Sequence, residues 1–360
     1  MFRIFAFLFA LIATSASAQT YPPQIAAINP ASLITLTDQA SADTLRSDLI
    51  TKIFGPAGMD TALQPTYFST YNFAGSTWAS VVNLNNIQEW RVTVAGGVVS
   101  RLYRFQPTTY RNPTTGKGAM IISAGHGQIG TSPPYTDIIK WLITSGYEVW
   151  TVDMPFSGLN GPPYTAYPTI NMGGRLGNVL VRNHDEAEAL LTPTFNPLRF
   201  FLEPPLSIVN NLNSRGITNI AISGLSGGGW TTDVYSALDT RIRASYSVAG
   251  SMPIYARSWA PPNPALGDWE QRAIPSLGTD YIDLYILSSI GTGRRHVNLH
   301  NLNDDCCFGG TIANHYAAAV GNVVNAIGGS YSVVIDNTAA THTITPWAAN
   351  WIEQDVATRF

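Results

Sequence analysis

The sequence predicts an α/β fold in which helices cover both faces of a mostly parallel sheet, with an N-terminal extension before it. Two patterns carry this prediction. From residue 119 to the C-terminus, short apolar runs typical of buried strands alternate with segments of helical periodicity. Before them, alternating apolar residues flank Ala95-Gly96-Gly97, which is the pattern of an antiparallel hairpin at the leading edge of the sheet.

The elements follow in chain order. Residues 19–87 are rich in Pro, Thr, Asn and Ser, so we expect an extension packed on the main domain, with one helix at 43–53. The hairpin strands are expected at 90–94 and 98–105. The later strands are expected at 119–123, 147–152, 217–223, 243–248, 296–300 and 331–335, and the helices at 135–143, 205–212, 230–238, 281–290, 312–327 and 347–356.

Length and composition exclude some classes of protein. The chain has 360 residues, 45% of them hydrophobic, which is enough for one α/β domain with insertions and excludes a disordered chain. It carries 20 Lys+Arg against 23 Asp+Glu. A nucleic-acid partner would require a basic excess or a basic stripe, so this balance argues against one.

The first 18 residues have the pattern of a signal peptide. A positive start at Met1-Phe2-Arg3 precedes the apolar run 4–13, and Ala16-Ser17-Ala18 fits the small-residue cleavage rule. The run is shorter than the roughly 20 apolar residues that span a bilayer. We therefore expect a secreted or periplasmic protein that begins at Gln19 and has no membrane anchor after cleavage.

The most specific motif is Gly224-x-Ser226-x-Gly228, which lies between a predicted strand and a predicted helix. A nucleophile elbow needs this arrangement, because a serine in a tight turn is exposed and small neighbours let strand and helix approach closely. A phosphate-binding turn is the alternative. It would require a G-K-[ST] sequence, which is not present here. The pattern therefore predicts Ser226 as a nucleophile.

A serine hydroxyl needs a base, which in turn needs a carboxylate to orient it. His342 follows the last predicted strand, at the edge of the sheet where open α/β sheets place their sites. Asp304 and Asp305 follow the penultimate strand. We favour Asp304 as the acid because it is nearer the strand end, with Asp305 as the alternative. Structural roles are expected for His296, His300 and His315, and His184 lies in the irregular segment 156–195.

The oxyanion of an acyl-transfer reaction needs two N–H donors. The amide of Gly227, directly after the nucleophile, is the first candidate. The second is expected in the loop after strand 119–123, where we assign it to Gln128 with Gly127 as the alternative. His126 in this loop is expected to be a hydrogen-bonded anchor.

The chain has two cysteines, Cys306 and Cys307, and they are adjacent. One such pair cannot form a disulfide framework for a fold of this size, but it can close a vicinal disulfide ring in an oxidising compartment. The alternative is two buried thiols beside a turn. Two neighbouring thiols without a second ligand pair lack the spacing of a zinc site, so the sequence predicts no metal and no cofactor.

From residue 88 to 360 the chain resembles the α/β-hydrolases of the esterase/lipase superfamily. The landmarks are the His126-Gly127 loop, the strand end before Asp153, the Gly224–Gly228 elbow and the terminal His342. The resemblance implies an eight-stranded, mostly parallel sheet and a structural role for Asp153 in ordering its loop. It also offers two segments as caps over the cleft, 156–195 and 253–280.

Together these features predict a secreted serine carboxylesterase that works through an acyl-enzyme on Ser226. Its substrates would be small or polymeric esters, such as acetylated polysaccharide or polyester. The alternatives are a serine peptidase or amidase, and a catalytically silent binding protein of the same fold. The fold cannot choose among them. The natural substrate, the acyl-chain preference and the oligomeric state are left open.

Overall fold

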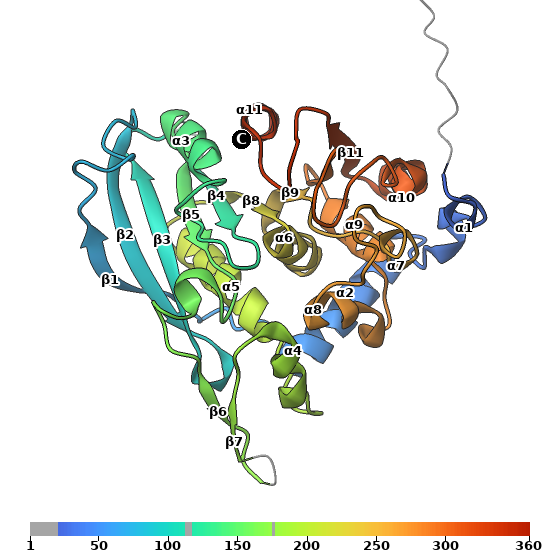
Figure 1. Ribbon diagram of the computed structural model, residues 1–360, viewed down its shortest axis with the longest axis horizontal. Coiled ribbons are helices and arrows are strands. Elements are labelled where there is room, and N and C mark those ends of the chain that lie inside the picture. The colour runs from blue at the N-terminus through green and yellow to red at the C-terminus, as the bar shows by residue number, and fades with distance from the viewer. Residues whose placement is uncertain (1–20, 112–116, 175–176) are drawn as a thin grey trace, which may run out of the picture.

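A computed structural model describes residues 21–111, 117–174 and 177–360. Its centre is a nine-stranded sheet in the order β1-β2-β3-β5-β4-β8-β9-β10-β11 (Figure 1). The six strands from β5 to β11 in this order run parallel, and β1, β2 and β3 are antiparallel at one edge. The signal peptide predicted at 1–18 lies outside the described residues.

Eight strands of the described residues overlap the positions that the sequence predicts, and the three at 66–71, 169–171 and 178–180 are not predicted by it. The strands are β1 (Thr66–Tyr71), β2 (Leu84–Thr93), β3 (Val99–Pro107), β4 (Gly118–Ser123), β5 (Glu148–Val152), β6 (Thr169–Asn171), β7 (Asn178–Leu180), β8 (Asn219–Leu225), β9 (Ile242–Val248), β10 (Arg295–Asn301) and β11 (Ser330–Asp336). The predicted hairpin is β2–β3, which turns at Ala95–Gly97, where Gly96 and Gly97 have positive φ.

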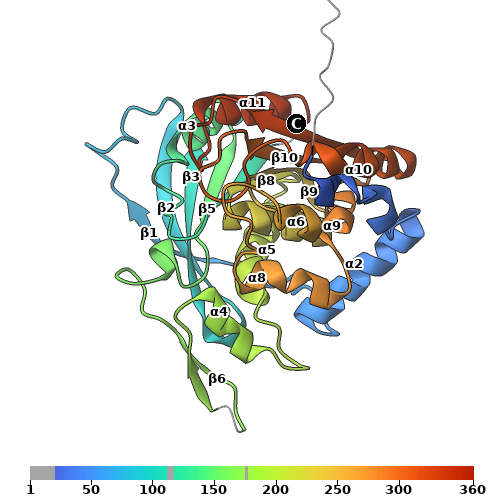
Figure 2. The same cartoon turned by 45° about the vertical axis from the view of Figure 1, so that its right-hand side comes forward.

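The helices cover both faces of this sheet. They are α1 (Pro23–Ala26), α2 (Gln39–Phe54), α3 (Thr136–Thr144), α4 (His184–Ala187), α5 (Arg199–Ser214), α6 (Gly227–Leu238), α7 (Ile254–Arg257), α8 (Trp269–Arg272), α9 (Tyr281–Ser289), α10 (Asn314–Ile327) and α11 (Pro346–Ala357). Helices α3 and α11 run together along one side of the sheet, whereas α5, α6 and α9 lie on the other side (Figure 2).

The eight strands implied by the resemblance become nine because β1 joins the edge of the sheet. Residues 66–71 belong to the predicted extension, yet they pair antiparallel with β2. Five of the six residues of β1 are exposed, so the strand lacks the apolar alternation that predicts a strand from sequence. The extension also contributes α2, which contacts α6 on the side of the sheet that α5, α6 and α9 cover.

The parallel strands explain where a site can form. Strands β4 and β5 are buried along their whole length, as expected for a sheet covered on both faces. Because the strands are parallel, the loops that follow β4, β8, β10 and β11 all leave the same edge of the sheet. Residues far apart in the sequence therefore meet there.

Two irregular segments, 156–195 and 253–280, come together near this edge. The first carries the small β6–β7 hairpin and α4, and the second carries α7 and α8. The Asp185 carboxylate of α4 accepts a hydrogen bond from the Trp269 amide and one from Arg272, both at 2.8 Å. Helices α4 and α8 therefore lie next to each other (Figure 1). In the described residues, no helix is long and apolar enough to cross a bilayer.

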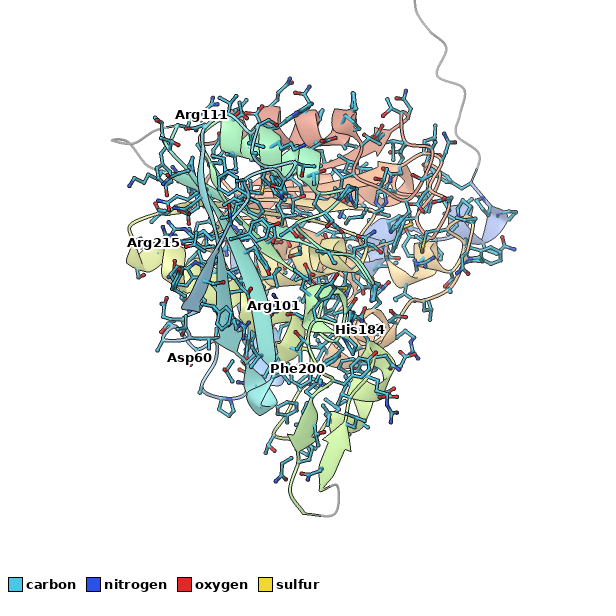
Figure 3. The ribbon with its side chains drawn as sticks, turned by 60° about the vertical axis from the view of Figure 1, so that its left-hand side comes forward. Asp60, Arg101, Arg111, His184, Phe200 and Arg215 are labelled. Atoms are coloured by element: carbon cyan, nitrogen blue, oxygen red, sulfur yellow. A yellow bond between two sulfur atoms is a disulfide. The ribbon has the colours of Figure 1, made fainter. Side chains whose placement is uncertain are left out.

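A buried carboxylate fixes the antiparallel edge of the sheet to its neighbours. Glu148 at the start of β5 is fully buried, and its oxygens pair with Arg104 of β3 at 2.8 Å and with Arg215 at 2.5 Å. Arg215 follows α5 and is labelled in Figure 3. Although burial raises the pKa of Glu148, the hydrogen bonds from Arg215 and Arg104 outweigh it and lower the pKa to about 2.

Replacing Glu148 by Ala is expected to lower the free energy of unfolding by about 3 kcal/mol, because two guanidinium groups lose their buried partner. The folded-state pKa is depressed, so the stabilisation is present above the unfolded-state pKa near 4.5 and is lost as pH falls toward about 2. Urea unfolding at several pH values measures both effects. Asp48→Ala, which breaks an exposed pair with Lys52, is the control and should cost less than about 1 kcal/mol.

Candidate active site

Ser226 occupies the sharp turn between β8 and α6. Its backbone has φ 58° and ψ −125°, in the positive-φ region that residues other than glycine rarely adopt. The flanking glycines are required by space. A Cβ at Gly224 would lie 2.3 Å from the Gly228 carbonyl oxygen, and one at Gly228 would lie 2.0 Å from the Ser123 oxygen. This geometry is that of a nucleophile elbow.

Gly227 is the first residue of α6, so its N–H has no acceptor within the helix. The position is also crowded: a Cβ there would lie 2.3 Å from Met154 Sδ and 2.5 Å from His126 Cε1. The loops after β4 and β5 therefore close against this turn. The helix N-terminus beside Ser226 stabilises negative charge, so an N–H group at this position can serve as an oxyanion donor. The role of Gly227 stays a prediction.

The structure brings His342 and Asp304 together. His342 follows β11, Asp304 follows β10, and Nδ1 of the imidazole lies 2.7 Å from Asp304 Oδ2. The other oxygen, Oδ1, accepts the Cys306 and Cys307 amides, both at 2.8 Å. Burial raises the pKa of Asp304, but the hydrogen bond from His342 and these amides lower it below its usual range.

Asp305 also contacts His342, but through the backbone. Its Oδ1 accepts the His342 amide at 2.7 Å. The two neighbouring carboxylates thus bind different parts of His342. Asp305 holds its main chain, and Asp304 holds its imidazole ring. Because an ionised carboxylate only accepts, the ring proton of neutral His342 lies on Nδ1, and Nε2 keeps its lone pair.

Ser226 and His342 line the same pocket, which has a volume of about 400 Å³. Its walls include Gln128, Arg257 and Asp268. Nε2 of His342 is buried and makes no hydrogen bond with the described residues, so the bond from the serine hydroxyl is not formed in this conformation. Hydrogen bonds between catalytic groups are often long without substrate and tighten in the complex.

The second oxyanion donor stays a prediction. The Gln128 amide closes a turn to the Gly125 oxygen at 3.2 Å, and its side-chain oxygen accepts from Tyr135. The Gly127 amide donates to Ser157 Oγ at 2.7 Å. Of the two amides, only that of Gln128 makes a long bond, and this residue lines the pocket with Ser226.

Three further predicted residues lie in loops that follow strands of the sheet. Asp153 accepts the Gly130 amide at 2.8 Å and the Leu159 amide at 2.7 Å, so it orders the loops after β4 and β5. Burial, the dominant cause, raises the pKa of Asp153 to about 6. Cys306 and Cys307 are joined in a vicinal disulfide, and they line the pocket.

The remaining histidines divide into two groups. His296 and His300 are buried in the sheet, and His315 lies on α10 against Tyr255, so these three lie away from the pocket. His126 and His184 instead meet each other, with their Nε2 and Nδ1 atoms 2.8 Å apart. This contact could not be predicted from the sequence, because 58 residues separate the two histidines.

Two acidic residues complete this contact: Asp268 and Glu270 lie beside both rings. Burial lowers the pKa of His126, but the hydrogen bonds to Asp268 and Glu270 raise it to about 9. No signal in the sequence marked these two acids, which lie in an irregular segment. The four residues form a cluster beside the pocket, which we call the His–carboxylate cluster.

The elbow, the sheet and the strand-end loops define the α/β-hydrolase fold, which confirms the fold class predicted from the sequence. Solved structures agree. The chain is similar to an acetyl xylan esterase from Paenibacillus sp. R4 (14% identity, 92% of this chain and 98% of that one, TM-score 0.56). It is also similar to acetyl xylan esterase 1 from Thermoanaerobacterium sp. JW/SL YS485 (15%, 92% and 98%, 0.55). A glucuronoyl esterase from Solibacter usitatus aligns over 95% of this chain and 98% of its own (12%, 0.57).

No protein-family model matches the sequence. A search of curated proteins likewise finds no significant match. The similarity is therefore one of fold, since identities near 14% carry no residue-level information on function.

The assignment of Asp304 rather than Asp305 to the His342 ring can be tested by proton NMR without any substrate. A short Nδ1–H bond to a carboxylate is expected to give a far-downfield resonance. Asp304→Asn and His342→Gln should abolish this signal, whereas Asp305→Asn should retain it. Loss of the signal in Asp305→Asn alone would contradict the assignment.

Proposed function

We propose that the protein is a serine carboxylic ester hydrolase that forms an acyl-enzyme on Ser226. The observation that carries the proposal is the convergence on one pocket of a strained elbow serine and a histidine whose ring is held by Asp304. A purely structural turn would have no need for the strain at Ser226 or for a buried lone pair on His342 Nε2.

The reaction follows from these positions. Ser226 Oγ attacks the carbonyl carbon of the ester while its proton passes to His342 Nε2. The carbonyl oxygen becomes an oxyanion, held by the Gly227 amide and by the amide of Gln128 or Gly127. The intermediate collapses as His342 gives the proton to the leaving alcohol oxygen. Water then attacks the acyl-enzyme by the same route and restores the serine hydroxyl.

Asp304 stabilises the imidazolium that forms during these steps. With one oxygen on Nδ1 and the other on two backbone amides, its carboxylate is held in position and stays ionised. The negative charge lies against the ring when the ring becomes positive. The vicinal disulfide supplies both of those amides, so Cys306 and Cys307 help to position the acid.

The proposed substrates are polymeric esters, with acetylated polysaccharide first. Support comes from the similar structures, which are named acetyl xylan and glucuronoyl esterases, and from the polar side chains of Arg257, Asn263 and Asp268 that line the pocket. The exported location predicted from residues 1–18 suits a substrate too large to enter a cell. The segments 156–195 and 253–280 remain the proposed cap.

Ser226→Ala is expected to lower kcat for ester hydrolysis by at least about 10³-fold, because no other group can form the acyl-enzyme. Ser223→Ala is the matched control: it removes a buried hydroxyl from the same strand, one that donates to the Tyr246 carbonyl at 2.9 Å. The measurement is turnover of a p-nitrophenyl ester together with mass-spectrometric mapping of a fluorophosphonate label. Retained hydrolysis in Ser226→Ala, or a label on another residue, would overturn the assignment.

Because Arg257, Asn263 and Asp268 place polar groups on the pocket walls, kcat/KM is expected to be at least roughly tenfold higher for acetyl esters than for esters of ten or more carbons. A panel of p-nitrophenyl esters of graded acyl length measures this ratio, with acetylated xylan and a polyester film as polymeric substrates. Aminoacyl amides serve as the comparison for peptidase activity. A rate that rises with chain length would contradict the prediction, as would faster cleavage of amides.

A further inference from the structure

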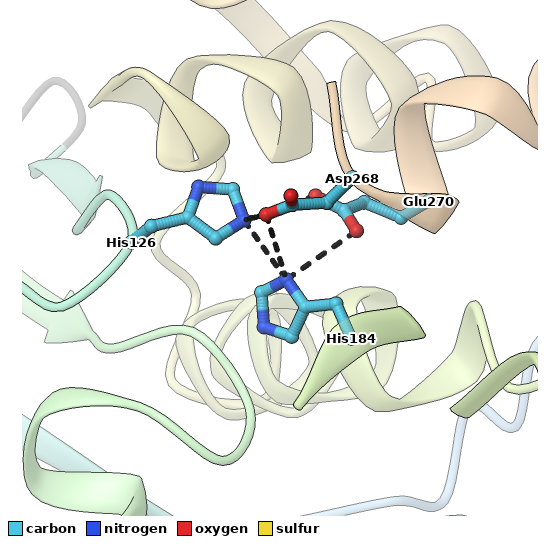
Figure 4. Close-up of side chains that lie close together, drawn as sticks. All are labelled: His126, His184, Asp268 and Glu270. Carbon is cyan, nitrogen blue, oxygen red and sulfur yellow. Dashed lines mark hydrogen bonds and ion pairs between the residues drawn. The ribbon is translucent and has the colours of Figure 1, made fainter. Parts of the chain in front are cut away.

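The His–carboxylate cluster connects three separate segments of the chain. His126 lies in the loop after β4, His184 begins α4, and Asp268 and Glu270 lie at the start of α8. Figure 4 shows the two imidazole rings and the two carboxylates converging on one point. Their ligand atoms all lie within 4.8 Å of one another.

The ring nitrogens of His184 and His126 carry too few hydrogens for the contacts that they make. His184 Nε2 lies 2.9 Å from the Pro155 carbonyl oxygen, which can only accept, so this nitrogen carries a hydrogen. In neutral His184 the Nδ1 atom is then a lone pair, and it faces His126 Nε2 at 2.8 Å. Across that contact between two ring nitrogens there is room for one hydrogen at most.

The same nitrogen of His126 also faces both carboxylates. It lies 2.8 Å from Asp268 Oδ2 and 3.1 Å from Glu270 Oε1. Asp268 and Glu270, when ionised, only accept. One hydrogen on His126 Nε2 would therefore have three acceptors at 2.8, 2.8 and 3.1 Å, and it can point at only one of them. A cation at the centre removes the conflict, because every converging atom becomes a ligand.

The carboxylate of Glu270 is buried without a full set of partners in the described residues. Glu270 is fully buried, and its Oε2 makes no hydrogen bond with the described residues. His184 Nδ1 lies 3.3 Å from Oε2, and in the neutral tautomer this nitrogen has no hydrogen to donate. Within the described part of the chain, no Lys or Arg pairs with this carboxylate. A buried charge needs a counter-charge, and a single proton on His126 would be shared between the buried Glu270 and the half-exposed Asp268.

The separations between the polar atoms of the cluster can be compared with those in a tetrahedral zinc site. A tetrahedral zinc ion with bonds of about 2.0–2.1 Å holds its ligand atoms about 3.3–3.4 Å apart. Here His126 Nε2 lies 2.8 Å from His184 Nδ1, 2.8 Å from Asp268 Oδ2 and 3.1 Å from Glu270 Oε1. His184 Nδ1 lies 3.3 Å from the other Glu270 oxygen, Oε2, and 4.0 Å from Asp268 Oδ2. In addition, the bond from His184 to Pro155 is the backbone contact that typically fixes the tautomer of a metal-ligating histidine.

We propose that the His–carboxylate cluster binds one divalent transition-metal ion of the zinc type. Two imidazoles and two carboxylates suit such an ion better than calcium or magnesium, which prefer oxygen ligands alone. Four protein ligands complete a tetrahedral shell, so the site is structural. It ties the segments 156–195 and 253–280 to the loop after β4. It also holds the His126 ring against Gly227, at the edge of the pocket.

The experiment uses the full chain, purified without a histidine tag, stripped with a chelator, incubated with zinc sulfate and desalted. Inductively coupled plasma mass spectrometry is expected to find one zinc per chain, and the melting temperature should rise with free zinc concentration. In His184→Asn and Asp268→Asn the affinity for zinc should fall at least roughly tenfold. Asp268 is half-exposed, so its substitution does not threaten folding.

Asp185→Asn is the matched control. Asp185 lies next to His184 and bonds Trp269 and Arg272 of α8, so this variant weakens the same contact between segments without removing a ligand. It should keep one zinc per chain. His342→Gln should also keep it, which excludes binding at the neighbouring group of Asp304, Cys306 and His342.

Two results would overturn the proposal: a stripped chain that takes up no zinc, or zinc content unchanged in both His184→Asn and Asp268→Asn. Metal content is measured without substrate. The outcome is therefore independent of whether Ser226 is the nucleophile.

Discussion

The close approach of β8 to α6 at Ser226 is the constraint on which the rest of the site depends. The backbone can turn there only because Gly224 and Gly228 leave no side chain between the strand, the helix and β4. The turn forces a positive φ on Ser226 and lifts its hydroxyl above the sheet. Parallel pairing of β8, β9, β10 and β11 then delivers the loops of Asp304 and His342 to the same edge.

The parts of this arrangement that could be predicted from sequence are those set by local patterns. The alternation of strands and helices and the Gly-x-Ser-x-Gly turn are signals carried by neighbouring residues. The edge strand β1 was missed because its side chains are exposed, so its formation depends on pairing with β2 rather than on its own pattern. Asp304 and Asp305 could not be separated with certainty either, since both contact His342 and only the structure distinguishes ring from backbone.

The His–carboxylate cluster could not be predicted for a different reason. Its four members come from three segments, and nothing in the spacing of His126, His184 and Glu270 resembles a metal motif, whose ligands usually lie a few residues apart. Each histidine taken alone suggests a structural residue in a loop. Only the meeting of α4 with α8 places the rings and carboxylates together, and that meeting depends on long-range packing.

Glu148 and Glu270 are both buried carboxylates, and each therefore needs a counter-charge. Both carboxylates are fully buried. Glu148 is balanced by two guanidinium groups, which donate to both of its oxygens. Among the described residues, Glu270 has only two imidazoles beside it, and these can place one hydrogen between them while the half-exposed Asp268 adds a second negative charge. The chain thus supplies its own cations to Glu148, whereas at the His–carboxylate cluster it supplies ligands, and the proposed divalent ion provides the missing charge.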